Sequence, residues 1–249
     1  MGARPVTDAE LAAKLAEGAG RRLLDLRANG GLEGKALGEA GDQLANRYLL
    51  RHLSAERPGD GLLSEESKDT EERLGKSRVW IVDPLDGTRE YGEARPDWAV
   101  HVGLAIDGVA EIGAVALPGL DGGIVLRSDQ PAPVLDHDGP PRLLVSRTRP
   151  AAEAVAVAAT LGGELVPMGS AGAKAMAVVL GQAEIYLHSG GQYEWDNCAP
   201  VAVARAHGLH CSRIDGSELR YNNRETYLPD LLVCRPEWAE RVLDAVAAL

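Results

Sequence analysis

The chain has 249 residues, enough for one large domain or for two smaller ones that share a core. Its formal net charge of -11 excludes the broad positive face with which proteins follow a nucleic-acid polymer. The three cysteines are widely spaced and odd in number, so they fit neither a C-x-x-C metal pair nor a disulfide framework. No apolar run resembles a signal peptide or a membrane span, so we expect a cytoplasmic protein without a membrane partner.

Two amphipathic helices are predicted at the start of the chain. Residues 7–27 have apolar side chains at helical spacing, and Thr7 begins a capping box with the glutamate three residues later. Residues 36–56 show the same periodicity and end before a Pro-Gly pair. A short apolar piece with two glutamates follows at 61–67, and the charged residues 70–78 predict a solvated loop.

Strands are predicted next. The residues VWIV at 79–82 form a buried strand, and residues 98–128 form three more, with turns at 107–108 and 120–123. The turn-rich segment 128–142 is the predicted boundary between two halves of one compact unit.

The two predicted halves are residues 1–140 and 141–249, and strands alternate with helices in the second. Its predicted strands are 143–147, 164–168, 183–188, 209–214 and 231–235, and its predicted helices are 150–161, 170–181, 195–208 and 236–249. Helices and strands interleave in both halves, and this pattern predicts a layered α/β fold.

Two aspartates, Asp83 and Asp86, stand three residues apart where the strand 79–82 ends. Two unit charges about 4 Å apart repel by roughly 4 kcal/mol at an effective dielectric near 20. A hard divalent cation such as Mg²⁺ relieves this repulsion, because it binds oxygen ligands including one or two carboxylates. Pro84 favours a rigid turn, and Gly87 lets the backbone come close to a ligand. The pattern therefore indicates a cation site.

The same segment has other possible interpretations. An ordinary Asp-Pro-Gly turn also fits these residues and stays open at this point. An EF-hand loop does not fit, because Pro84 and Leu85 offer no side-chain oxygen. The segment GSAGAK at 169–174 does not match the phosphate-binding loop of nucleotide triphosphatases.

Three segments together resemble the inositol monophosphatase superfamily. They are SEES at 64–67, VDPLDGT at 82–88 and EWDNCAP at 194–200. The resemblance implies a Mg²⁺-dependent, lithium-sensitive phosphomonoesterase with two or three cations per site. It also implies a five-layered αβαβα sandwich, a homodimer, and a metal site whose ligands come mostly from residues 1–140.

The resemblance assigns metal ligands residue by residue. Glu65 would bind a cation, and Asp83 would bridge two cations. Leu85 would contribute its backbone carbonyl, and Asp86 would bind the second cation. Asp196 would complete that second site from the other half of the chain. Asp86 and Asp196 would also lie against the substrate.

The resemblance also implies a water-activating group. Thr88, together with Glu65, would orient the attacking water, and Asp42 would polarise Thr88. Asp42 could otherwise be a solvated carboxylate on a helix face. The backbone N–H groups of Gly87 and Thr88 would hold the phosphate if a helix or turn begins there.

Two further segments favour one branch of the superfamily. GSAGAK at 169–174 and SRT at 146–148 resemble the bisphosphate nucleotidases, often called CysQ in bacteria. The resemblance implies hydrolysis of 3′-phosphoadenosine 5′-phosphate to AMP and phosphate, with Arg147, Ser170 and Lys174 near the nucleotide.

Some of these substrate contacts have plainer alternatives. Lys174 could be a solvated helix residue, although its Gly-Ser surroundings suit anion binding. His188 stands where some relatives have an arginine that reaches a distal phosphate, but a lone histidine there is more often structural. Lys35 receives no role.

Other functions remain open from the sequence. Inositol 1-phosphate or fructose 1,6-bisphosphate could be the substrate, so the partner is a small phosphorylated nucleotide or polyol. From other classes, the chain could be a catalytically silent nucleotide or metal sensor, or a structural acidic scaffold. Glu65 and Thr88 argue against a sensor, which need not keep a water-activating pair.

Overall fold

The computed structural model describes residues 4–120, 122–133, 137 and 139–249. Its helices are α1 (Asp8–Asn29), α2 (Gly34–Glu56), α3 (Thr88–Gly92), α4 (Ala152–Leu161), α5 (Ala171–Val179), α6 (Glu194–Ala206) and α7 (Pro236–Ala247), with a short 3₁₀ helix η1 (Glu72–Gly75). Its strands are β1 (Gly61–Ser64), β2 (Arg78–Asp86), β3 (Ala99–Ile106), β4 (Val109–Leu117), β5 (Ile124–Arg127), β6 (Arg142–Ser146), β7 (Glu164–Met168), β8 (Ile185–Tyr193), β9 (His210–Ser212) and β10 (Tyr227–Cys234).

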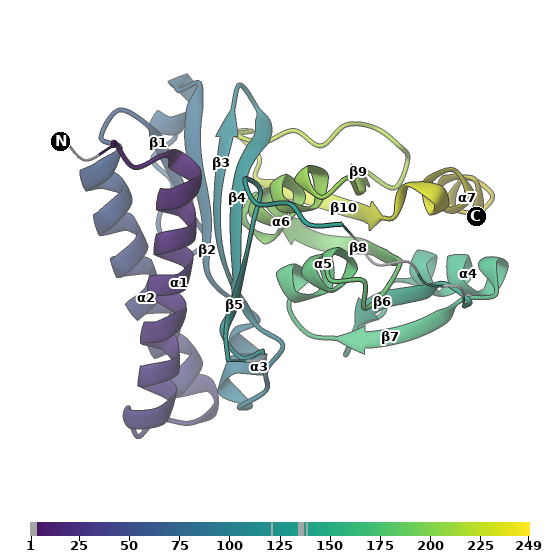
Figure 1. Ribbon diagram of the computed structural model, residues 1–249, viewed down its shortest axis with the longest axis horizontal. Coiled ribbons are helices and arrows are strands. Elements are labelled where there is room, and N and C mark those ends of the chain that lie inside the picture. Colours follow the sequence, from purple (N-terminus) through teal and green to yellow (C-terminus); the bar gives the residue numbers. More distant parts are fainter. Residues whose placement is uncertain (1–3, 121, 134–136, 138) are drawn as a thin grey trace.

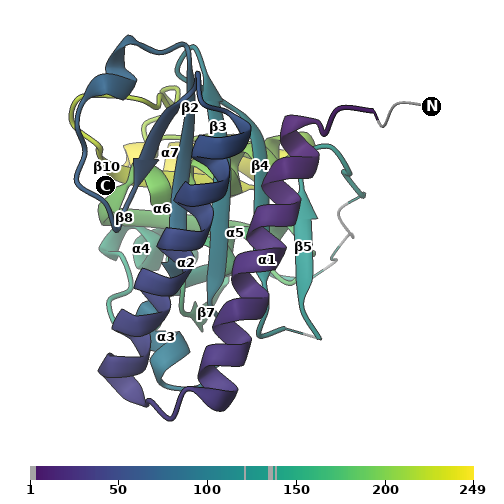
Figure 2. The same cartoon turned by 90° about the vertical axis from the view of Figure 1, so that its left-hand side faces the viewer.

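These elements stack in five alternating layers (Figure 1). The helices α1 and α2 lie side by side across one face of a sheet with strand order β1-β2-β3-β4-β5 (Figure 2). The helices α5 and α6 separate it from a second sheet, with order β7-β6-β8-β10-β9, whose outer face is covered by α4 and α7. The predicted α/β class and five-layered αβαβα sandwich are confirmed.

The apolar residues of β2 form an unbroken run because both faces of this strand are buried. Successive side chains of a strand point to opposite faces of the sheet. Val79 and Ile81 pack toward α6 in the central core, whereas Trp80 and Val82 pack against α1 and α2. Both faces of the sheet are covered, so alternation between polar and apolar residues is absent. The next residue, Asp83, has the same parity as Val79 and Ile81, which favours the face toward the central layer.

Most predicted elements are present within a few residues of their predicted ends. The capping box at Thr7 forms, with the Glu10 backbone N–H donating to Thr7 Oγ1 and the Thr7 N–H donating to Glu10 Oε2. The three strands predicted over 98–128 are β3, β4 and β5, paired antiparallel. Asp121 of the predicted turn at 120–123 lies outside the described residues.

The predicted turn at Pro84 is wrong. The strand β2 continues through Asp86, and a register shift lies between Asp83 and Asp86. A proline is tolerated in a sheet at such a bulge, where no ladder hydrogen bond needs its missing N–H.

The predicted solvated loop at 70–78 is exposed over most of its length, but it departs from the prediction at its centre. It contains the helix η1, and Arg73 is buried with a relative exposure of 2%. Its guanidinium pairs with Asp69 at 2.6 Å and donates to the Asn222 side chain at 2.8 Å and the Asn223 carbonyl at 3.0 Å. A buried charge is tolerated when it is paired and hydrogen-bonded, and here Asn222 and Asn223 come from a distant segment that local composition does not reveal.

The division into halves stays a prediction, although the first sheet ends at Arg127 and the second begins at Arg142. Residues 134–136 and 138 of the predicted boundary segment lie outside the described residues. Among the described helices, none has the length and apolar character needed to cross a membrane.

Candidate metal centre

A one-residue bulge in β2 brings its two aspartates to one side of the sheet. Asp83 pairs with His101 and Asp86 with Ala99, so three steps along β2 match two along β3. In a regular strand, residues three apart point to opposite faces, and an inserted residue reverses this. The bulge at Pro84 therefore lets Asp83 and Asp86 face the same space.

A third aspartate reaches this space from the other half of the chain. Carboxylate oxygens of Asp83, Asp86 and Asp196 lie within 4.8 Å of one another. Asp196 stands in the first turn of α6, and its Oδ2 accepts a hydrogen bond of 2.6 Å from the Tyr193 backbone N–H. Asp83 Oδ1 likewise accepts one of 3.0 Å from the Leu85 N–H. Both carboxylates are held by backbone donors.

Glu65 lies beside this group at its solvent-facing side. Its side chain is exposed, and its carboxyl group shares a hydrogen bond with that of Asp83. The segment that carries it is held by Asn46 of α2, whose amide donates to the Glu66 carbonyl at 3.2 Å and the Ser67 hydroxyl at 3.0 Å. The predicted ligands Glu65, Asp83, Asp86 and Asp196 thus come together.

The crowded carboxylates have perturbed pKa values. Burial, and then the charges of Glu65 and Asp86, raise the pKa of Asp83 well above its usual range. Burial and the charge of Asp86 raise the pKa of Asp196 to about 7. Partial burial and neighbouring carboxylates also raise the pKa of Glu65 to about 7, although solvent screens the charges around this exposed side chain. A divalent cation would relieve this repulsion, and the donors are oxygens of the kind that Mg²⁺ binds.

Asp86 differs from the others because it is surrounded by donors. Its Oδ2 accepts from the Ser170 hydroxyl at 2.5 Å and the Gly172 N–H at 2.6 Å, and its Oδ1 accepts from the Ala171 N–H at 3.1 Å. His101 Nε2 lies 3.2 Å from Oδ2. Although burial disfavours the charge, these partners hold the pKa of Asp86 at about 2. Asp86 is therefore ionised and ready to bind a cation.

The predicted water-activating pair is in contact. The Thr88 hydroxyl lies 3.2 Å from Asp42 Oδ1 and 3.1 Å from the Leu85 carbonyl oxygen, and it can donate to either. Gly38 permits this approach of α2, since a Cβ there would stand 2.7 Å from Thr88 Cγ2. Asp42 is buried, and burial together with the charge of Glu66 raises its pKa to about 7. The solvated alternative for Asp42 is wrong.

The helix α3 begins at Thr88, directly after Gly87. Gly87 has φ of 88°, the left-handed region that glycine adopts without strain. A Cβ at this position would also meet Ser170 Cβ at 3.2 Å and Trp98 Cβ at 3.3 Å. A helix thus begins where the predicted phosphate contact of the Gly87 and Thr88 N–H groups requires one. The contact itself stays a prediction.

Lys174 and Ser170 lie at the start of α5, where their side chains are already engaged. Lys174 is buried, and its Nζ donates to the carbonyl oxygens of Gly169 at 3.2 Å and Ser170 at 2.6 Å. Burial lowers the pKa of its ammonium group. The alternative of a solvated Lys174 is wrong. The Ser170 hydroxyl gives its hydrogen to Asp86, so both residues brace the loop that supports this carboxylate.

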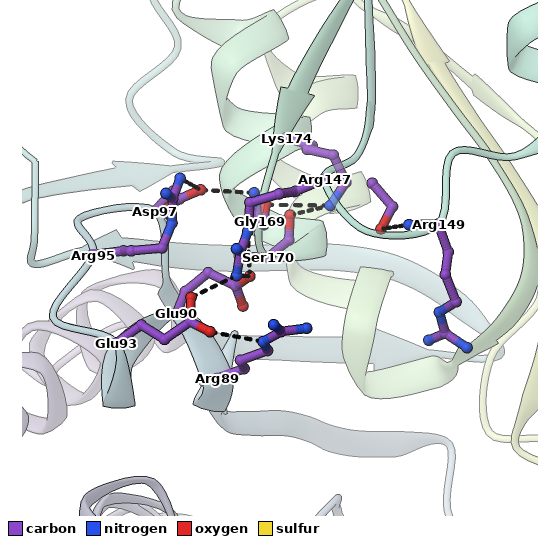
Figure 3. Close-up of polar contacts among 11 residues, drawn as sticks. Arg89, Glu90, Glu93, Arg95, Asp97, Arg147, Arg149, Gly169, Ser170 and Lys174 are labelled. Atoms are coloured by element: carbon purple, nitrogen blue, oxygen red, sulfur yellow. Dashed lines mark hydrogen bonds and ion pairs between the residues drawn. The ribbon is translucent and has the colours of Figure 1, made fainter. Parts of the chain in front are cut away.

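Arg147 and the surface around it form an open cavity of about 440 Å³ beside the centre. The residues lining it are Arg89, Glu90, Ser146, Arg147, Thr148, Arg149, Met168, Gly169, Ser170 and Lys174, most of which are drawn in Figure 3. Arg147 pairs with Glu90 at 2.7 Å and with Glu93 at 2.8 Å. Arg149 is exposed at the rim, and no carboxylate among the described residues pairs with its guanidinium. We call this space the cationic cavity.

His188 lies on β8, and two residues of the cationic cavity act on its charge. Burial, together with the charges of Lys174 and Arg149, lowers the pKa of His188 to about 4, so its ring is neutral at pH 7. Its ring centroid lies 6.2 Å from that of Tyr186. The predicted substrate contact of His188 stays a prediction.

Sequence reasoning missed several residues of the site. Asn46 follows Asp42 by one helical turn on the same face of α2, and this spacing is a usable signal. His101 is the single ionisable residue in the buried strand β3. Arg149, two residues after Arg147, carried no separate signal.

The chain matches the family model described as the inositol monophosphatase family over residues 6–132 and 141–248. It is 50% identical over 255 residues to 3′-phosphoadenosine 5′-phosphate phosphatase of Mycobacterium leprae, covering 97% of this chain and 94% of the relative. It is 52% identical over 239 residues to the Mycobacterium tuberculosis protein of that name, covering 92% and 89%. The 3′(2′),5′-bisphosphate nucleotidase CysQ of Escherichia coli is 29% identical over 201 residues, covering 76% of this chain and 81% of that protein.

Solved structures show the same fold. The crystal structure of CysQ from Bacteroides thetaiotaomicron has a TM-score of 0.78 at 24% identity and covers 92% of this chain and 97% of that chain. Inositol monophosphatase from Anabaena has a TM-score of 0.75 at 21% identity, covering 97% and 95%. At these identities the likeness concerns the fold alone.

Proposed function

The chain belongs to the inositol monophosphatase family and is a phosphoric monoester hydrolase, and on that premise we propose that it is a Mg²⁺-dependent 3′-phosphoadenosine 5′-phosphate phosphatase. The products would be AMP and phosphate. The proposal rests above all on the convergence of Asp83, Asp86 and Asp196 beside the Thr88–Asp42 contact. Relatives of that name are about half identical over nearly the whole chain, which supports the choice of substrate.

The proposed metal ligands are Glu65, Asp83, the Leu85 carbonyl, Asp86 and Asp196. Mg²⁺ held there would act as a Lewis acid on the phosphoryl group and lower the pKa of a bound water. The number of ions, two or three, is part of the proposal.

The protein groups have separate tasks in this scheme. Thr88, held by Asp42, would orient the attacking water together with Glu65. The backbone N–H groups of Gly87 and Thr88 would hold the phosphate, with Asp86 and Asp196 close to it. Preorganised donors of this kind stabilise developing charge without reorganising during the reaction.

The cationic cavity suits the rest of a nucleotide substrate. A bisphosphate nucleotide has a second phosphate that a simple inositol monophosphate lacks, and guanidinium groups bind phosphate well. Arg149 is free of carboxylate partners among the described residues, and Arg147 keeps Nη1 beyond the two nitrogens used for Glu90 and Glu93. Ser170 and Lys174 would support this side of the site through the loop that they brace.

The test is phosphate release from 3′-phosphoadenosine 5′-phosphate, inositol 1-phosphate and fructose 1,6-bisphosphate, with Mg²⁺, with chelator, and with Mg²⁺ plus lithium. We expect Mg²⁺-dependent, lithium-inhibited turnover that is fastest on the nucleotide. Faster turnover of inositol or fructose phosphate would overturn the substrate but keep the metal centre. No turnover of any substrate would favour a silent sensor.

We also propose a homodimer and a cytoplasmic location, and each has a simple check. A homodimer predicts twice the 26.3 kDa chain mass in light scattering. A cytoplasmic location predicts recovery with the cytosolic fraction of the source cells.

A further inference from the structure

His101 is a buried residue that contacts one candidate metal ligand, Asp86, and the residue next to another, Asp196, in the other half of the chain. It lies on β3 with a relative exposure of 0%. Its Nδ1 lies 3.0 Å from the Trp195 carbonyl oxygen, one residue before Asp196. Its Nε2 lies 3.2 Å from Asp86 Oδ2. One imidazole ring therefore spans the gap between the bulge of β2 and the first turn of α6.

The two ring nitrogens of His101 make contacts of different kinds. A carbonyl oxygen only accepts hydrogen bonds, so Nδ1 carries a hydrogen and donates to Trp195. The contact of Nε2 with Asp86 is at ion-pair distance but lacks hydrogen-bond alignment, and no other described group bonds to this buried nitrogen. A buried polar atom without a full hydrogen bond is costly, so a function for its position is indicated.

The packing around the ring holds it in one place. A Cβ on Gly172 would stand 1.9 Å from His101 Nε2, so a larger residue at this point of α5 would have to displace the ring. The backbone N–H of Gly172 donates to the same Asp86 oxygen that faces the ring. The ring, the start of α5 and the bulge of β2 thus form one close-packed unit.

The contacts on Asp86 are unevenly divided between its two oxygens. Oδ2 faces His101, Ser170 and Gly172, whereas Oδ1 accepts one hydrogen bond, from Ala171. The ring therefore helps to turn the carboxylate so that Oδ1 has the greater free capacity. Groups that orient a metal ligand in this way typically change metal affinity about 10- to 100-fold when mutated.

We propose that His101 is a positioning residue that sets the placement of Asp86 relative to the Trp195–Asp196 segment, so that both carboxylates are arranged before a cation binds. The inference rests on the proposed metal centre but not on the identity of the phosphorylated substrate. A buried ring that bridges β2 and α6 couples the halves of the centre more directly than surface contacts would.

The test uses His101→Gln and His101→Asn, two variants that each retain one contact. A glutamine amide can reach the position of Nε2, and an asparagine amide can reach that of Nδ1. Mg²⁺ binding to the purified full chain is measured by calorimetry without substrate, and kcat and KM are then measured at saturating Mg²⁺. We expect the Mg²⁺ Kd to rise about 10-fold in each variant, with KM changed less than about twofold.

Ser212→Ala is the matched control, because Ser212 is buried and hydrogen-bonded in the second sheet away from the centre. It should lose stability without a change in Mg²⁺ Kd. If the histidine variants do not fold, Gly172→Ala provides the second test, since its methyl group displaces the ring while the imidazole remains. It should also weaken Mg²⁺ binding.

Wild-type Mg²⁺ affinity in the folded variants would overturn the positioning role, and so would a raised KM with an unchanged Kd. Mg²⁺ binding by the wild type without hydrolysis of the nucleotide would overturn the proposed function alone. A wild type that binds no Mg²⁺ would overturn both.

Discussion

The metal centre and the cationic cavity are neighbours of opposite charge, and they are built differently. In the centre, Asp83, Asp86 and Asp196 each accept a backbone hydrogen bond and cannot move independently. In the cavity, Arg149 is exposed, and the guanidinium group of Arg147 is held by the side chains of Glu90 and Glu93. The reacting phosphate would meet fixed groups, and the remainder of the substrate would meet movable ones.

On this contrast, the fixed centre would carry out the reaction, and the movable side chains of the cavity would select the substrate. A metal cluster needs its ligands within a few tenths of an ångström, which favours backbone donors and buried side chains. A second phosphate is bound adequately by long cationic side chains, whose partners can exchange. Changes in the centre should therefore reduce all activities together, and changes in the cavity should alter the preference among substrates.

The largest expected effect comes from Asp86→Asn. It removes the ionised carboxylate that His101, Ser170 and Gly172 hold in place. We expect kcat/KM to fall about 1000-fold on every phosphate substrate, because charge stabilisation at the phosphoryl group is lost. Phosphate release assays at saturating Mg²⁺ measure this. Asp244→Asn on the exposed side of α7 is the control, and an equal loss there would contradict the assignment.

A smaller loss is expected from Thr88→Val, which keeps the shape of the side chain but removes the hydroxyl that contacts Asp42. We expect kcat to fall about 100-fold, within the range of proton-transfer and water-orienting groups. The Mg²⁺ Kd should stay near that of the wild type. Thr88→Ser, which keeps the hydroxyl, should recover most of the activity. Equal activities in the two variants would remove Thr88 from the mechanism.

Arg149→Ala tests whether the cationic cavity selects among substrates. We expect kcat/KM for 3′-phosphoadenosine 5′-phosphate to fall about 10-fold, because one charge-assisted contact to the second phosphate is lost. Turnover of inositol 1-phosphate, which has no second phosphate, should change little. Arg51→Ala removes the same charge from an exposed face of α2 and should change neither rate. A parallel loss on both substrates would place Arg149 outside substrate selection.

The smallest expected effect is a pH-dependent rise in Tm when Mg²⁺ binds. The pKa of Glu65 and of Asp196 is about 7, and that of Asp83 is also raised, so these three groups bind more protons in the metal-free folded chain than in the unfolded chain between pH 4 and 7. Their contribution to the stability of the fold therefore falls as pH rises through this window, and the repulsion among them is greatest above it. Mg²⁺ should raise Tm by a few degrees more at pH 8 than at pH 6, as calorimetry can measure. In Asp86→Asn the difference should shrink, and an equal rise at both values in the wild type would contradict this account.

Much of the architecture was predictable from local pattern. The capping box at Thr7, the apolar run in β2 and the alternation of elements after residue 142 each follow from hydrophobic period and capping chemistry. The candidate metal ligands could be identified by motif resemblance, because each stands in a short segment of distinctive residues. The roles of these ligands still depend on the tests above.

The errors and omissions have a common cause in long-range contacts. Arg73 seemed solvated because its partner Asn222 lies 149 positions away in the sequence. His101 was missed because its two partners lie in segments separated from it along the chain.

By itself the sequence determined the α/β class, the element order and the residue types available for a cation site, because period, capping and charge spacing act over a few residues. Only the tertiary structure decided how the bulge at Pro84 turns Asp83 and Asp86 to one side, and how Asp196 joins them from α6. The physical reason is that pKa values, ligand orientation and cavity charge depend on distances between segments, and chain packing alone sets those distances.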